Sequence, residues 1–226
     1  MRFSRPVLAY TLPFLVFLAG IGLVALVEGF GKGSDSLLLR EPRYWVFPLQ
    51  TIVCAILIAI FWKEYEFKNR GGVFWGIGAG LLVLAVWVSP QLLFGQPARR
   101  DGFNPDLVTD PTMYWLTVVG RFVRLALVVP ILEELFWRGF LMRYLIREDF
   151  QKVPLGAYSP LSFFGVAVLF MFEHGMADWP AALFTGLLWG YLMIRTKSLV
   201  ACIVAHAVAN LGLGLYVMAT KQWGFW

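Results

Sequence analysis

Charged residues are scarce in this chain. Asp, Glu, Lys and Arg together make up only 15% of its 226 residues, whereas 59% are hydrophobic. A soluble globular domain carries about 25% charged residues, so this composition excludes an ordinary water-soluble protein. Apolar runs of about 20 residues match the hydrocarbon core of a bilayer, which is roughly 30 Å thick. The sequence therefore predicts an all-α fold, a polytopic transmembrane helical bundle.

Cysteine and the common catalytic motifs are also nearly absent. The two cysteines, Cys54 and Cys202, both fall in predicted spans, which favours packing over a disulfide. No cysteine pair has the spacing of a thiolate zinc site, and neither G-x-S-x-G nor H-E-x-x-H occurs. Basic residues gather at the ends of apolar segments, which fits a membrane surface and not nucleic acid. We expect a lipid bilayer as partner and no nucleic acid.

Hydropathy and turn residues divide the chain into about seven spans, and the first is too long for the apolar part of a signal peptide. They cover residues 7–27, 45–62, 72–94, 112–146, 160–174, 180–194 and 198–219. We expect two parts: three N-terminal spans without a motif in 1–111, and the functional core in 112–226. Loops on the side of the N-terminus hold more Lys and Arg than those opposite, which predicts a cytoplasmic N-terminus.

Local sequence signals mark two helices more closely. Gly72, Gly76 and Gly80 recur every fourth residue, the spacing that lets membrane helices approach closely. Asp110 followed by Pro111 predicts a helix N-cap and a proline in the first helical turn. The helix that begins there is longer than one membrane crossing.

The long helix carries three charges inside an apolar run. Each costs about 2.5–3.5 kcal/mol at membrane depth on insertion scales, so each needs a partner or a wet cavity. Glu134 and Arg138 are four residues apart with the acid first, so they share a face and are expected to pair. Glu133 lies about 100° round the helix and has no local cation, which leaves it free for chemistry. In the alternative, both glutamates are structural and Arg121 or Arg124 neutralises Glu133.

Downstream polar residues supply candidate partners for Glu133. His174 and His206 are the only histidines of the chain, and both lie in apolar segments, where burial indicates a functional partner. Asn210 follows His206 by four residues, so both side chains can point into one cavity. At about 1.5 Å per residue, Glu133, His174 and His206 lie roughly 20, 21 and 12 Å from the inner ends of their segments. These depths are compatible with one shared site.

Three motifs on consecutive membrane segments carry a resemblance to a known family. They are Glu133-Glu134-x-x-x-Arg138, Phe170-x-x-x-His174 and His206-x-x-x-Asn210. In this order they resemble the CAAX-protease and bacteriocin-processing family of intramembrane glutamate peptidases, which includes the Ras-converting CAAX endopeptidases. The resemblance covers roughly residues 112–219, so 112–226 would be a CAAX-protease-like catalytic core. The residues beside the glutamates resemble a bacterial branch associated with C-terminal sorting, which would place the chain in a bacterial inner (plasma) membrane.

The resemblance implies an integral-membrane endopeptidase that uses no metal and no cofactor. It would cut near the C-terminus of a membrane-associated or lipidated protein substrate. Glu133 would be the general base, and His174 would help to hold the attacking water. His206 and Asn210 would stabilise the oxyanion. The resemblance also assigns two supporting residues, Glu134 and Arg138. This chemistry is reasonable, because amide hydrolysis needs a base for water and donors where charge develops on the carbonyl oxygen.

Three alternatives stay open at this point. Glu173 directly precedes His174, and Asp178 follows soon after. Together with Glu133, Glu134, His174 and His206, these two carboxylates could build an oxygen–nitrogen metal site for a metal-dependent membrane peptidase. A second alternative is a non-catalytic, immunity-like scaffold of the same fold. The third is a proton- or ion-coupled carrier, since buried Glu and His also form relays, although no inverted repeat is evident. Asp178, also near the site, is expected to cap the following helix.

Overall fold

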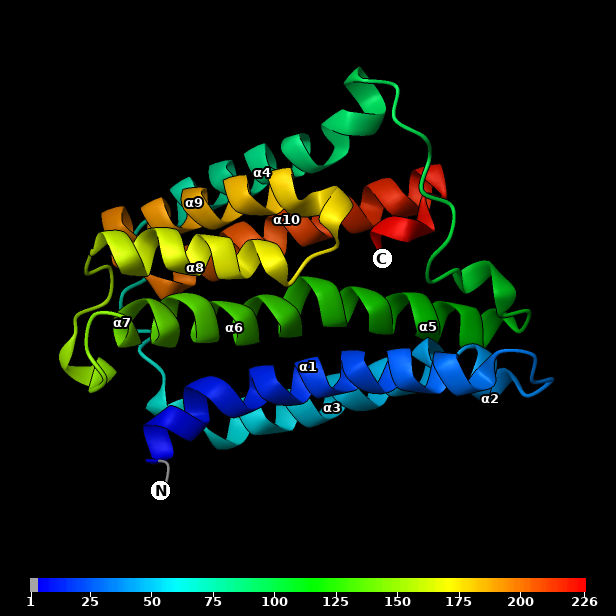
Figure 1. Cartoon of the computed structure of the whole chain (residues 1–226), viewed down its shortest axis with the longest axis horizontal. Helices are drawn as coiled ribbons and strands as arrows, with labels where there is room; N and C mark the ends of the chain where they lie inside the picture. Colours follow the sequence, from blue (N-terminus) through cyan, green and yellow to red (C-terminus); the bar gives the residue numbers. More distant parts are fainter. Residues whose placement is uncertain (1–3) are drawn as a thin grey trace.

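Helices laid along one long axis form nearly the whole molecule (Figure 1). The computed structural model describes residues 4–226, and no β-strand occurs within them. The predicted all-α bundle is thus confirmed. Its α-helices are α1 (Arg5–Gly31), α2 (Leu37–Arg40), α3 (Arg43–Ile60), α4 (Val73–Leu93), α5 (Pro111–Val123), α6 (Val129–Glu134), α7 (Met142–Tyr144), α8 (Pro160–Phe172), α9 (Trp179–Thr196) and α10 (Leu199–Thr220).

Every predicted span corresponds to a helix, with ends that differ by a few residues. Five helices of the described chain are long and apolar enough to cross a bilayer: Arg5–Gly31, Arg43–Ile60, Val73–Leu93, Pro111–Tyr144 and Leu199–Thr220. Helix α8 is apolar but has only 13 residues, roughly 20 Å, so it is shorter than a hydrocarbon core. It packs closely with α9. That these two helices also cross the membrane stays a prediction.

The long helix Pro111–Tyr144 begins as the sequence predicts. Asp110 is its N-cap, and the side-chain Oδ1 accepts a hydrogen bond from the backbone N–H of Met113 at 2.8 Å. Pro111 occupies the first helical position, where its missing N–H costs nothing. The cap therefore satisfies one of the free N–H groups at the helix start.

Two π-helical segments, Arg124–Val128 and Leu135–Leu141, interrupt the long helix on either side of its glutamates. In the first, the N–H of Val129 donates to the carbonyl of Arg124, five residues back. The carbonyl of Leu125 therefore loses its usual α-helical donor, and the residue five positions on is Pro130, which has no N–H. This carbonyl is left for a donor from outside the helix.

The long helix lies in the middle of the bundle. Figure 1 shows α1 and α3 along one of its sides and α8, α9, α10 and α4 along the other. Helix α4 makes its most extensive contact with α10, although the two are far apart in sequence. The three N-terminal spans therefore share one core with residues 112–226.

The glycine spacing of α4 marks a close approach to α10, as predicted. A Cβ placed on Gly76 would lie 2.4 Å from the carbonyl oxygen of Ala201. On Gly80 it would lie 2.4 Å from the carbonyl oxygen of Ala205. Because these neighbours are backbone atoms, a side chain at either glycine would push the helices apart.

Replacing Gly76 by Ala should therefore destabilise the protein by about 1–3 kcal/mol, the usual cost of overpacking. The matched control is Gly78→Ala on the same helix, where an added Cβ meets nothing within 4 Å. Thermal unfolding in detergent should show a lower midpoint for Gly76→Ala and an unchanged midpoint for Gly78→Ala. Equal midpoints for the two variants would contradict the close α4–α10 contact.

Candidate active site

A buried carboxylate anchors the polar residues of the bundle. Glu134 and Arg138 are both 0% exposed. Oε1 of Glu134 accepts a hydrogen bond from Nη1 of Arg138 at 3.0 Å, so the predicted pair is confirmed. The same oxygen lies 3.1 Å from Nδ1 of His206, a contact that the sequence did not predict. One carboxylate oxygen therefore holds an arginine of its own helix and a histidine of α10.

The remainder of Arg138 is also enclosed. Its Nη2 lies 3.5 Å from the carbonyl of Gly186 on α9, at the limit of a hydrogen bond. The guanidinium carbon is 5.0 Å from the ring centre of Phe170 and 5.5 Å from that of Trp189, within cation–π range. The ring of Trp189 in turn packs on His206, with centroids 4.6 Å apart. These contacts fix the orientation of the Arg138 and His206 side chains.

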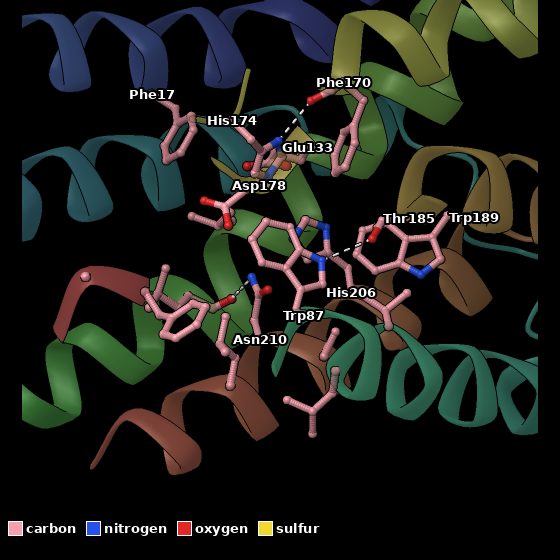
Figure 2. Close-up of a pocket in the computed structure, with 18 residues that line it drawn as sticks. Phe17, Trp87, Glu133, Phe170, His174, Asp178, Thr185, Trp189, His206 and Asn210 are labelled. Carbon is pink, nitrogen blue, oxygen red and sulfur yellow. Dashed lines mark hydrogen bonds between the residues drawn. The ribbon is translucent and has the colours of Figure 1, made fainter. Parts of the chain in front are cut away.

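Glu133 faces a cavity of about 230 Å³, which we call the Glu133 cavity. His174, His206 and Asn210 also line it, so the structure brings the four predicted residues to one place (Figure 2). Glu133 is 6% exposed, and no hydrogen bond or ion pair from any residue of 4–226 reaches its carboxylate. The carboxylate oxygens of Glu133 are therefore free to bind water or a ligand in the cavity.

Neither arginine proposed to neutralise Glu133 does so directly. Arg124 donates from Nε and Nη2 to Oε1 of Gln50, at 3.1 and 3.0 Å. Arg121 lies against the rings of Phe47 and Phe103, with its guanidinium carbon 5.0 and 4.9 Å from their centres. Neither arginine forms a direct ion pair with Glu133 within residues 4–226, but the charges of Arg124 and Glu133 still act on each other.

His174 sits just beyond the C-terminal end of α8, where the helix stops and its ring can turn into the cavity. Nδ1 lies 2.9 Å from the carbonyl oxygen of Phe170. Because a carbonyl only accepts, Nδ1 carries the proton, and Nε2 of the neutral ring is then an acceptor. The ring also packs on Trp87 of α4, with centroids 5.4 Å apart. This arrangement leaves Nε2 available to accept a hydrogen bond from water.

Asn210 is held by the irregular backbone of the long helix. Its Nδ2 donates to the carbonyl of Leu125 at 2.8 Å, which supplies the donor that the π-helical segment and Pro130 leave missing. The amide group has two hydrogens, so one remains for another acceptor. The backbone geometry of the long helix thus determines where the Asn210 amide lies in the cavity.

Several residues of the cavity were missed by the sequence analysis. Trp87 of α4 donates from Nε1 to the hydroxyl oxygen of Thr185 at 3.2 Å, and Phe17 of α1 closes another wall. Aromatic side chains in a motif-free span give no signal that distinguishes a cavity wall from lipid-facing packing. The N-terminal helices therefore contribute to the cavity although they carry no motif.

Asp178 corrects one prediction. It occupies the N-cap position of α9, but its side chain makes no capping hydrogen bond. Instead its Oδ1 accepts from Nη1 of Arg99 at 2.6 Å. The guanidinium of Arg99 also lies 4.5 Å from the ring of Phe225, and its backbone carbonyl accepts from the N–H of Gly224. Asp178 therefore pairs with an arginine of a distant loop and does not cap its own helix. Through Arg99 the loop, the α8–α9 turn and the C-terminal residues are held together beside the cavity.

Glu173 does not complete a metal site in the described chain. Its Oε2 accepts from the indole Nε1 of Trp137 at 3.2 Å. Within residues 4–226 no group of three or more His, Cys, Asp and Glu side chains is arranged to hold a metal ion. The donor set for the metal-dependent alternative is therefore not assembled in this conformation.

The fold and the buried cavity define a helical membrane protein with an internal polar cavity. Residues 115–212 match a family model described as type II CAAX prenyl endopeptidase Rce1-like, and this range includes all the motif residues. The match supports the resemblance of these residues to the CAAX-protease and bacteriocin-processing family of membrane endopeptidases. No curated protein and no solved structure matches it.

Removal of Glu134 should strongly destabilise the protein, because it leaves Arg138 buried without its counter-ion. Glu134→Ala should cost about 3–5 kcal/mol in unfolding free energy, whereas the double variant Glu134→Leu/Arg138→Met should recover most of it. Denaturation in mixed micelles measures both. The control is Arg5→Ala, which breaks an exposed pair with Glu64 and should cost no more than about 1 kcal/mol. A Glu134→Ala variant as stable as this control would contradict the anchoring role.

Proposed function

We propose that this protein is an integral-membrane endopeptidase that hydrolyses a peptide bond near the C-terminus of a membrane-associated protein. The observation that carries the proposal is that only one of the two adjacent glutamates, Glu134, is bound by other side chains. Glu134 is committed to Arg138 and His206, whereas Glu133 faces the cavity without a partner among the described residues. A free carboxylate shielded from bulk water is suited to act as a general base.

In the proposed reaction Glu133 takes a proton from a water molecule as the water oxygen attacks the carbonyl carbon of the substrate. Nε2 of His174 accepts a hydrogen bond from the other O–H of this water, which orients the water and stays on the oxygen as it attacks. The new C–O bond forms a tetrahedral intermediate with negative charge on the former carbonyl oxygen. Glu133 then delivers the proton to the departing nitrogen as the C–N bond breaks, so the carboxylate is regenerated.

Two donors would stabilise the oxyanion. Asn210 can offer the amide hydrogen that Leu125 does not use. His206 directs Nδ1 to Glu134, so Nε2 can donate only from the doubly protonated ring. Glu134 would offset the positive charge of that ring, and Arg138 would hold Glu134 in place. Donors fixed before the reaction stabilise developing charge at little reorganisation cost.

The proposed organisation follows from the same residues. Residues 112–226 would form the catalytic core, and the helices of 1–111 would complete its walls through Phe17 and Trp87. We further propose a bacterial inner (plasma) membrane as its location, with the N-terminus in the cytoplasm. The Arg99–Asp178 pair beside the cavity would then lie toward the outer side of the bilayer.

Replacing Glu133 by Gln or Ala should reduce cleavage by at least about 100-fold, because a general base typically contributes 10²–10⁴-fold. Comparison of the membrane proteomes of cells with the wild-type protein and with the variant should reveal substrates that keep their C-terminal residues. Glu148→Gln, which removes an exposed carboxylate, should process the same substrates normally. Full processing by folded, inserted Glu133→Gln would refute the assignment and favour the scaffold alternative or a carrier.

Chelation distinguishes this mechanism from metal-dependent hydrolysis. Metal-dependent hydrolysis needs this test because Oε1 of Glu173 is buried without a hydrogen-bond partner among the described residues and could bind a metal ion. We expect cleavage of a substrate found by the proteome comparison to continue at an unchanged rate in excess EDTA or 1,10-phenanthroline. Loss of activity with chelator, restored by added Zn²⁺, would replace the glutamate-base mechanism by the metal-dependent one.

A further inference from the structure

The Glu133 cavity is too small to hold a peptide on both sides of a scissile bond. Its volume is about 230 Å³, whereas pockets that enclose a drug-sized molecule measure roughly 300–1,000 Å³. Phe170 and Trp189 line the cavity next to Arg138 and are each only 2% exposed, so that part of the wall belongs to the packed core. A chain segment can therefore reach Glu133 only after another part of the wall has moved.

The α8–α9 turn, residues 175–178, is an exposed part of this wall. Met176 is 77% exposed, and no residue of the 3₁₀ turn Met176–Asp178 is buried. Figure 2 shows Asp178, the last residue of the turn, among the side chains that line the cavity together with His174. Segments that bury few apolar atoms open at a low cost in free energy. The α8–α9 turn can therefore move without loss of core packing.

A single ion pair fastens the α8–α9 turn to the rest of the molecule. Oδ1 of Asp178 accepts from Nη1 of Arg99 at 2.6 Å, and both side chains are 21% exposed. No other side-chain hydrogen bond or ion pair joins residues 175–178 to any of residues 4–226. An ion pair that water can reach contributes little net free energy, because hydration replaces each partner. The contact can therefore hold the turn in place and still open.

Arg99 itself belongs to a firmly packed support. Its backbone N–H donates to Oε1 of Gln222 at 3.2 Å, and its carbonyl accepts from the N–H of Gly224 at 2.9 Å. A Cβ placed on Gly102 would overlap the carbonyl oxygen of Trp223, so the loop and the C-terminal residues touch backbone to backbone. The loop and the C-terminal residues are thus held together by several contacts, whereas the α8–α9 turn is held by one.

We propose that the α8–α9 turn is a gate to the Glu133 cavity and that the Arg99–Asp178 ion pair is its latch. When the pair breaks, the turn swings away from the support about Gly175 and widens the cavity beside His174. A Cβ on Gly175 would approach only Oδ2 of Asp178, at 3.9 Å, so space surrounds this position. Glycine also accepts the backbone changes that a hinge requires. The gate controls access and does not depend on the peptidase function.

Labelling of a reporter cysteine measures the opening without any substrate. Val83 of α4 lines the cavity and is 2% exposed, and Val83→Cys keeps a side chain of similar size. The full-length protein is placed in nanodiscs and treated with fluorescein maleimide, a bulky water-soluble reagent. Arg99→Gln or Asp178→Ala should raise the labelling rate about 5-fold, as expected for loss of an exposed ion pair. Arg100→Gln, which removes the neighbouring exposed positive charge, should leave the rate unchanged.

The double variant shows whether the two residues act as one latch. Arg99→Gln/Asp178→Ala should label no faster than either single variant, because each substitution already breaks the same contact. Effects that multiply in the double variant would show that the residues act separately and would overturn the proposal. An unchanged labelling rate in either single variant would also overturn it.

The native cysteines separate gating from a general loosening of the fold. Cys54 and Cys202 are both 0% exposed, and neither lines the cavity. Without Val83→Cys, the Arg99 and Asp178 variants should label as slowly as the wild type. If the native cysteines are accelerated as much as the reporter, the bundle has loosened as a whole and no gate exists. Latch-dependent labelling in a protein that cleaves nothing would refute only the peptidase function.

Discussion

The site depends on one oxygen atom. Oε1 of Glu134 accepts from Arg138 and contacts His206, so a single buried carboxylate connects the long helix to α10. Arg138 extends the connection to α9 through Gly186. In a medium of low dielectric such bonds are strong when every partner is present and costly when one is lost. The positions of the imidazole, the indole on which it packs and the neighbouring helices therefore depend on Glu134.

The backbone contributes as much as the side chains. A π-helical segment and a proline leave the carbonyl of Leu125 without a helical donor, and Asn210 donates to it. The bond compensates a local defect of the long helix and also places the amide at the cavity. A more regular helix would satisfy its own carbonyls and would give Asn210 no reason to lie there. Irregularity in a membrane helix is here tolerated because a neighbouring helix supplies the missing donor.

The sequence predicted what helix geometry determines and missed what depends on packing. The spans, the Asp110 cap and the Glu134–Arg138 pair follow from hydropathy and from fixed spacings of three or four residues. The contacts of His206 with Glu134 and of Asp178 with Arg99 join residues far apart in the chain. Their formation depends on how separate helices and loops meet, which no local pattern records. The motif resemblance supplied this long-range information for the four cavity residues, but not for Phe17 or Trp87.

The extra residue of the first π-helical segment has a consequence for the rotational phase of the long helix. In an unbroken α-helix Arg124 and Glu133 would point in opposite directions, roughly 180° apart, and Arg121 would lie roughly 120° from Glu133. A π turn takes up one additional residue, which reduces these angles to roughly 80° and 20°. The π-helical segment Arg124–Val128 thus brings the arginines at its start and Glu133 beyond its end closer to one side of the helix. Deleting one residue there would keep the length, charge and hydropathy of the helix almost unchanged and would still separate its two polar faces.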